Sequence, residues 1–265
     1  GMAALDRSVP AVKGDAARTL FSVDSHKIAW AVLDSGVDSA HPAFLDAANA
    51  ATRVRKTFDF TRVRELVSAD NDRLTDADLT RLLHGVRMTK AEAKRRLKEL
   101  RRDCEEQRPV NWDVVEELLT LDEPPVPVNP HGTHVAGIIG ARPSADTRQP
   151  GGMCPEIQLY DFRVLARSME DTEFAVIAAL QYIRYVNERH SYVTIHGANL
   201  SLSIPHNVRN YACGRTPVCN ECQRVVDSGV VVVAAAGNRG YQRFESKEGL
   251  FENYAAFSIT DPGNA

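Results

Sequence analysis

The sequence predicts an α/β protein whose sheet is doubly wound and mainly parallel, with a helical insertion. Apolar runs of strand length alternate along the chain with segments of helical periodicity. Several of these runs are apolar at nearly every position, which is typical of parallel strands buried on both faces. The stretch 62–122 breaks this alternation with charged helical patterns. We therefore expect right-handed crossovers between parallel strands, and a separate helical segment outside the main core.

Length and composition narrow the class of protein. The 265 residues can bury one large core, or one core with an inserted subdomain. The net charge is only -3, and no basic run is interleaved with aromatic residues, so we expect no nucleic-acid partner. No apolar run approaches membrane-spanning length, and residues 1–26 lack the layout of a signal peptide. With an odd number of cysteines, five, these features favour a cytoplasmic protein without a membrane partner.

The first elements lead to a carboxylate at a strand end. Residues 3–24 are polar and show no clear pattern, and we expect them to lie over the surface. The run 27–33 predicts a buried strand that ends at Asp34, and 57–60 predicts a short second strand. In open α/β sheets, sites are built at the carboxyl edge of the strands, which is where this sequence puts Asp34.

The 62–122 segment has the pattern of several short helices. Thr75 with Asp78 and Thr89 with Glu92 fit capping boxes, and Asn111 is a candidate cap for a helix over 111–121. We interpret the segment as a helical insertion on the outside of the core. Its dense charges favour a solvated face, with substrate gating or partner binding as the alternative.

The stretch 129–141 predicts a loop that enters a buried helix with unusually small side chains. Pro130 supplies a fixed φ just before the helix, and Gly132, Ala136 and Gly140 allow another backbone to pack closely. A histidine at the first turn, His131, would be held rigidly above the sheet, where a general base is useful. A single histidine at a helix start is more often structural, so this interpretation requires partner residues.

The second half continues the alternation. We expect a strand over 156–162, a helix over 171–189, a strand over 198–202, a helical end to 211–226, and a central strand over 229–236 that stops at Gly237 and Asn238. The buried stripe of the long helix is expected to comprise Phe174, Ile177, Ala178, Ile183 and Val186.

Three separated signals resemble one family. They are Asp34-Ser35-Gly36, the segment His131-Gly132-Thr133-His134-Val135-Ala136-Gly137, and Ala234-Ala235-Ala236-Gly237-Asn238. Their order resembles that of the subtilisin-like (subtilase) serine peptidases, in which Asp, His and Ser follow one another along the chain. The resemblance covers 27–60 and 129–261 and leaves out the insertion. It implies a three-layer sandwich in which 1–265 is a single catalytic domain, incomplete at its C-terminal end and interrupted by 62–122.

The resemblance also implies the roles of individual residues. His131 would be the general base, and Asp34 would hold the other imidazole nitrogen and stabilise the imidazolium. Asn238 matches the side chain that donates to the oxyanion. Ser201, Leu202 and Ser203 resemble one edge that holds an extended peptide, and 235–237 (Ala235, Ala236, Gly237) resembles the other wall of the P1 pocket. The small residues of that second wall favour a large apolar P1 side chain, although Ser203 stands where the family usually has Gly.

One part of the family pattern is missing. The nucleophile of the family lies in a Gly-Thr-Ser-x-Ala segment downstream of the oxyanion Asn, and no serine of this chain stands in that context. Without a nucleophile no acyl-enzyme forms, so we expect the 265 residues alone to be inactive. The missing part would leave apolar surface on the sheet and on the 131–141 helix. We expect that face to pair with the missing C-terminal part or to self-associate.

Metal sites are weaker candidates. Cys213, Cys219 and Cys222 form C-x5-C-x2-C with His206 nearby, which leaves open a structural zinc site, a disulfide or plain thiols. The family often binds calcium through an Asp after the His-Pro of the first motif, but Ala43 stands there, so that site is expected to be absent. His131 and His134 lack the spacing of a zinc peptidase motif, and His134 is expected to be buried. We therefore expect no cofactor, with calcium as a possibility.

Two hypotheses remain open from the sequence. The first is an intracellular subtilisin-like serine endopeptidase that acts on polypeptides with a Ser beyond Ala265. The second is a Ser-less pseudopeptidase that uses the same groove as a peptide-binding or regulatory module. The presence of Asp34, His131 and Asn238 together favours the first hypothesis.

Overall fold

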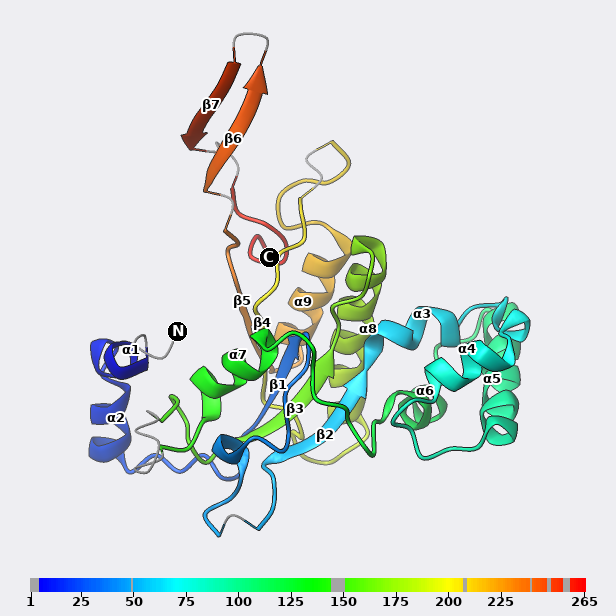
Figure 1. Ribbon diagram of the computed structural model, residues 1–265, viewed down its shortest axis with the longest axis horizontal. Helices are drawn as coiled ribbons and strands as arrows, with labels where there is room; N and C mark the ends of the chain where they lie inside the picture. Colours follow the sequence, from blue (N-terminus) through cyan, green and yellow to red (C-terminus); the bar gives the residue numbers. More distant parts are fainter. Residues whose placement is uncertain are drawn as a thin grey trace.

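A parallel sheet organises the chain. The computed structural model describes residues 5–48, 50–143, 151–206, 209–238, 240–246, 249–254 and 258–265 (Figure 1). Five strands pair in the order β2-β3-β1-β4-β5, and every pairing is parallel. The mainly parallel α/β fold predicted from the sequence is thus confirmed. The strands are β1 (Ala29–Asp34), β2 (Val54–Asp59), β3 (Gln158–Arg163), β4 (Gly197–Leu200) and β5 (Val231–Ala234).

The strand order places Asp34 at a change of direction in the topology. The chain first builds β2 and β3 on one side of β1 and then builds β4 and β5 on the other side. Ligands bind in open α/β sheets at the carboxyl end of the strands where this reversal occurs. Asp34 ends β1 and lies opposite Arg163 of β3 in the register.

Helices cover both faces of the sheet because successive strand residues point to opposite faces. Val32 belongs to the core cluster that contains Val135 and Ala136 of α7 (His131–Gly140). Ala31 and Leu33 belong to the other core cluster, which is covered by α8 (Met169–Glu188) and α9 (Pro217–Asp227). The result is a three-layer arrangement with the sheet in the middle.

An aromatic cluster joins the sheet to α8 and to the insertion. Phe58 and Phe162 meet edge to face with their ring centroids 5.3 Å apart, and Tyr182 of α8 lies 5.0 Å from Phe58. Trp112 of the insertion packs on Tyr182 at 5.7 Å. Such ring pairs add about 0.5–1.5 kcal/mol each beyond the area they bury, so the cluster fixes the insertion to the main core.

The insertion contains the helices α3 to α6 and lies beyond β2 (Figure 1). Both predicted capping boxes are present, with Thr75 and Thr89 as the caps. Asn111 precedes its helix but makes no side-chain cap, and its Nδ2 donates to Glu99 Oε1 at 3.3 Å. The elements are α3 (Val63–Leu66), α4 (Asp76–Leu82), α5 (Lys90–Glu105) and α6 (Trp112–Leu119), with 3₁₀ turns at Phe60–Arg62 and Asn71–Arg73.

The N-terminal region forms two helices that the sequence analysis did not predict. They are α1 (Leu5–Ala11) and α2 (Gly14–Phe21). No residue of α2 is buried, and Leu20 and Phe21 are exposed. At 8 residues, α2 is shorter than the window of roughly 11–18 residues over which apolar periodicity identifies a helix. A further 3₁₀ turn, Pro42–Phe44, follows β1.

Two other predictions were wrong. The strand expected at the centre of the sheet, β5, is an edge strand among the described residues, and Val231 and Val233 are 56% and 47% exposed. An apolar run looks the same in either position, because only the neighbouring strand distinguishes them. Phe174 is also exposed and lies outside the buried face of α8.

Beyond β5, the antiparallel hairpin of β6 (Tyr241–Ser246) and β7 (Gly249–Tyr254) projects from the sheet (Figure 1).

Candidate active site

The structure brings Asp34 and His131 into direct contact. His131 Nδ1 lies 2.8 Å from Asp34 Oδ1 and 3.0 Å from Oδ2. The Asp34 side chain is 1% exposed, whereas that of His131 is 49% exposed. A carboxylate only accepts hydrogen bonds, so this contact places the imidazole proton on Nδ1. Nε2 is then the basic nitrogen and belongs to the half-exposed ring.

The carboxylate is fixed by its own loop as well as by the histidine. The backbone amide of Ser35 donates to Asp34 Oδ1 at 2.7 Å. This hydrogen bond and the burial of the strand end leave the carboxylate little freedom. The imidazole therefore has one preferred tautomer and orientation, which general base catalysis requires.

Short contacts hold the first turn of α7 onto the loop that follows β1. The Asn129 side chain accepts from the His131 amide at 3.0 Å, so it satisfies one of the free amides at the start of the helix. Ser35 Oγ donates to the Asn129 carbonyl at 3.0 Å and accepts from the Gly132 amide at 3.1 Å. Thr133 Oγ1 accepts from the amide of Asp38 at 2.9 Å. The serine beside the Asp–His pair is thus engaged in positioning the helix.

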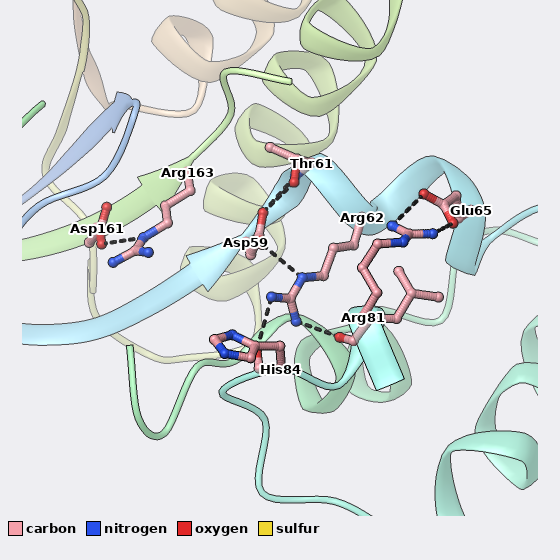
Figure 2. A network of polar contacts seen from close by, with 9 residues as sticks. Asp59, Thr61, Arg62, Glu65, Arg81, His84, Asp161 and Arg163 are labelled. Carbon is pink, nitrogen blue, oxygen red and sulfur yellow. Dashed lines mark hydrogen bonds and ion pairs between the residues drawn. The ribbon is translucent and has the colours of Figure 1, made fainter. Parts of the chain in front are cut away.

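A buried ion pair lies on the β3 side of this loop. Arg163 Nε donates to Asp161 Oδ2 at 3.0 Å (Figure 2), and Asp161 is fully buried. Burial raises the pKa of Asp161 to about 6, although the charge of Arg163 lowers it. A Cβ atom on Gly36 would lie 2.9 Å from Arg163 Nε, so the arginine packs directly against the Asp34 loop. The sequence analysis missed this pair, because two charged residues within a strand carry no local signal of where they lie.

The remaining predicted residues lie at the same edge of the sheet. Ala235 donates through its amide to the Leu200 carbonyl at 3.1 Å, which sets the second wall beside the end of β4. A Cβ atom on Gly237 would lie 3.4 Å from Ser203 Oγ, so the two expected groove segments do approach each other. Asn238 is exposed beyond the end of β5. The structure therefore brings the groove segments together, and it places Asn238 two strands away from Asp34.

The other residues predicted to line the groove differ in their burial and contacts. Leu202 is buried, Ser201 Oγ accepts from the side-chain Nδ2 of Asn199 at 2.9 Å, and Ala236 is exposed. Thr260 was not predicted, but its amide donates to the Ala236 carbonyl at 3.1 Å. This hydrogen bond joins the segment 235–237 to the last described residues. No motif in the sequence indicated its position.

A second Asp–His contact joins His206 and Asp261, the residue that follows Thr260. His206 Nδ1 lies 3.0 Å from Asp261 Oδ2, and the Asp261 side chain is 1% exposed. Asn264 donates to Asp261 Oδ1 at 2.6 Å, and Ile204 pairs with Asp261 through two backbone hydrogen bonds. These contacts join the segment after β4 to the last described residues.

The candidate metal residues do not form a cluster. Cys213 is exposed, whereas Cys219 and Cys222 are buried on α9. Across the described part of the chain, no group of three His, Cys, Asp or Glu residues is arranged to hold a metal ion. Ala43, at the position considered for calcium, is buried.

The prediction that His134 is buried was wrong. Its position on α7 places it on the exposed face of the helix.

This sheet topology and carboxyl-edge geometry define an α/β protein with the fold of the subtilisin-like proteases. The Clostridium perfringens CspB protease has a similar structure, with a TM-score of 0.50 and 19% identity over 86% of this chain and 40% of that one. Tripeptidyl peptidase 2 also has a TM-score of 0.50, at 14% identity over 84% of this chain and 27% of that one.

The chain belongs to the subtilase family. The family's sequence profile, peptidase S8, matches residues 25–265. Subtilisin DY of Bacillus licheniformis is 33% identical over 115 residues, which make up 42% of this chain and 35% of that protein. The matched region thus spans about a third of this curated relative. Within the described residues, no helix has both the length and the apolar character needed to cross a bilayer.

Proposed function

We propose that this chain is part of a serine endopeptidase that hydrolyses peptide bonds with an Asp, His and Ser triad. The observation that supports this most is the contact between the buried Asp34 carboxylate and His131 Nδ1 at 2.8 Å. It leaves Nε2 as the base for a hydroxyl nucleophile. His131 would take the proton of the attacking serine and return it to the leaving amine, while Asp34 stabilises the imidazolium.

The nucleophile in this proposal comes from residues beyond Ala265. The serine nearest the pair in sequence, Ser35, already donates to the Asn129 carbonyl and accepts from the Gly132 amide. Abstracting its proton would remove a contact that holds α7 in place. The 265 residues by themselves are therefore proposed to be inactive.

Asn238 is proposed to donate to the oxyanion, and the segments 201–203 and 235–237 to hold the polypeptide substrate. In support, the two segments are adjacent and end at the carboxyl edge of the sheet. Removing a single oxyanion donor typically costs about 2.7–4 kcal/mol of transition-state stabilisation. That cost would appear in kcat rather than in substrate binding.

The exposed edge strand and α7 are proposed as the face that meets the rest of the domain or a second copy. Val231 and Val233 expose apolar side chains on β5. On α7, a Cβ atom at Gly137 would have no neighbour within 4 Å. Sedimentation of the 265-residue chain, alone and mixed with the following part of the domain, tests this. A chain that sediments as a monomer and does not bind the added part would contradict this proposal.

All five cysteines are free thiols in the structure, which is consistent with a reducing compartment. A cytoplasmic location is therefore proposed as well. Fractionation of the source cells tests this, and recovery of the protein outside the cell would contradict it.

Fluorophosphonate labelling of the native gene product tests the peptidase proposal. We expect the label on one serine beyond Ala265, and we expect His131→Ala to abolish it. His134→Ala is the matched control, because that exposed histidine belongs to the same helix but has no carboxylate partner in the described contacts. A native protein that takes no label would instead favour a peptide-binding pseudopeptidase.

A further inference from the structure

A charged pocket lies at the carboxyl ends of β2 and β3, on the side of β1 opposite the predicted P1 walls. Its volume is about 540 Å³, and Asp59, Glu65, Arg81, Leu165, Arg167 and Asp171 are among its lining residues. Two of these, Glu65 and Arg81, belong to the insertion helices α3 and α4. The insertion thus supplies one wall, and the segment between β3 and α8 supplies the other.

The sheet register gives the distance from this pocket to the Asp–His pair. Asp59 pairs with Arg163, and Arg163 pairs with Asp34, so the three residues lie side by side. Neighbouring strands are about 4.8 Å apart, which puts Asp59 roughly 10 Å from Asp34. An extended peptide advances about 3.4 Å per residue. In the proposed peptidase mechanism the scissile bond lies beside the Asp–His pair, so a substrate residue about three positions away would reach the pocket.

The insertion wall is held firmly in place. Arg62 is buried, and its Nε donates to Asp59 Oδ2 at 2.7 Å (Figure 2). Its guanidinium also donates to the carbonyls of Leu82, the last residue of α4, and of His84, two residues beyond it. One side chain thus ties the end of β2 to the end of α4. A pocket with fixed walls can discriminate between substrate side chains.

The charges of the pocket are paired, with one exception. Arg62 pairs with Asp59, Arg81 pairs with Glu65 at 2.6 Å, and Asp171 pairs with Arg64 at 2.7 Å. Arg167 is exposed, and no ion pair is recorded for it with any residue that the structure describes. A substrate carboxylate would find a cation here whose charge is not already neutralised. A substrate ammonium would find only carboxylates that already have partners.

We propose that this pocket is a substrate subsite that selects an acidic side chain about three residues from the scissile bond, with Arg167 as its recognition group. The inference rests on the proposed peptidase function and assigns the insertion a part in specificity. Because Arg167 is solvent-exposed, the expected selectivity is modest, about two- to fivefold in kcat/KM.

The test uses the intact gene product and quenched fluorescent peptides that carry Asp, Gln or Lys at each of the four positions on either side of the cleaved bond. We expect Asp to be preferred over Gln, and Gln over Lys, at a position about three residues from that bond. Arg167→Glu should reverse the order, because it replaces the unpaired cation of the pocket by a carboxylate. Arg102→Glu, at an exposed arginine of α5 away from this pocket, is the matched control and should change nothing.

The outcomes separate the two proposals. Cleavage with equal rates for Asp, Gln and Lys at every position overturns the subsite and leaves the peptidase proposal standing. A preference for Asp that persists in Arg167→Glu also overturns it. Failure to cleave any peptide, together with no fluorophosphonate labelling, overturns the peptidase proposal and the subsite with it.

Discussion

Gly132 packs against the backbone of Gly36. A Cβ atom at position 132 would lie 2.5 Å from the Gly36 carbonyl oxygen and 3.0 Å from its amide nitrogen. Gly36 itself has a φ of 120°, a conformation that side-chain-bearing residues rarely adopt. The approach of His131 to Asp34 therefore depends on two residues without side chains, one on each side of the contact.

Gly132→Ala tests this contact. We expect it to lower the free energy of unfolding by about 1–3 kcal/mol, because the backbone must move apart to admit the methyl group. Gly137→Ala is the control on the same helix: it has open space and should raise the free energy by about 0.5–1 kcal/mol. Urea unfolding of the 265-residue chain measures both. Equal effects of the two substitutions would contradict the packing argument.

Asp34→Asn tests the role of the carboxylate. The amide would donate towards His131 Nδ1 and favour the tautomer that carries its proton on Nε2. We expect fluorophosphonate labelling of the intact protein to slow by about 10³–10⁴-fold. Asp38→Asn, at a half-buried carboxylate of the same loop, serves as the control. Labelling of Asp34→Asn at the native rate would exclude a catalytic role for Asp34.

Asp161 predicts a pH dependence of stability. Because burial raises its folded pKa from 3.8 to about 6, the folded state holds this proton more tightly than the unfolded state does. The contribution of Asp161 to stability is therefore greatest below pH 4 and decreases as the pH rises to about 6, by about 3 kcal/mol.

Asp161→Asn should remove this pH dependence, because asparagine does not ionise. The substitution can also change stability by an amount that is the same at every pH. Unfolding by urea at pH 4, 5, 6 and 7 gives the difference in free energy between the native sequence and the variant. We expect that difference to shift against the native sequence as the pH rises. A shift in the other direction would mean that the ionised carboxylate is favoured by folding.

Four of the five cysteines should react in two groups. Cys104 and Cys213 are exposed, whereas burial raises the pKa of Cys219 to about 11 and that of Cys222 to about 12. Alkylation depends on the thiolate and on access to it. Brief treatment of the folded protein with iodoacetamide at pH 7.5, followed by peptide mapping, should modify Cys104 and Cys213 first. Rapid modification of Cys222 would show that α9 is open to solvent.

Local sequence predicted the parts of the site that depend on neighbouring residues. The strand that ends at Asp34 and the helix that begins at His131 both carry strong local patterns, and the structure joins them. The burial of the Asp161 and Arg163 ion pair beside the Asp34 loop was not predictable, because it depends on β3 lying next to β1. His134 was misplaced for a related reason: its spacing on the helix does not say which face is covered.

The same limit applies to the fold. Alternating apolar runs predicted a parallel sheet, but the strand order rests on contacts between distant segments. A run such as 229–236 fits the middle of the sheet or its edge equally well. The capping boxes at Thr75 and Thr89 were predicted correctly, because each involves only four consecutive residues.

The position of β1 in the middle of the sheet has a consequence for the order of folding. Ala29 pairs with Gln158, and Trp30 pairs with Gly197, so the first strand made is flanked by strands made much later. Folding slows when most contacts join distant parts of a chain. During synthesis the apolar strand β1 remains without its neighbouring strands while the insertion emerges from the ribosome. A nascent chain that stops before β3 should therefore need a chaperone to remain dispersed.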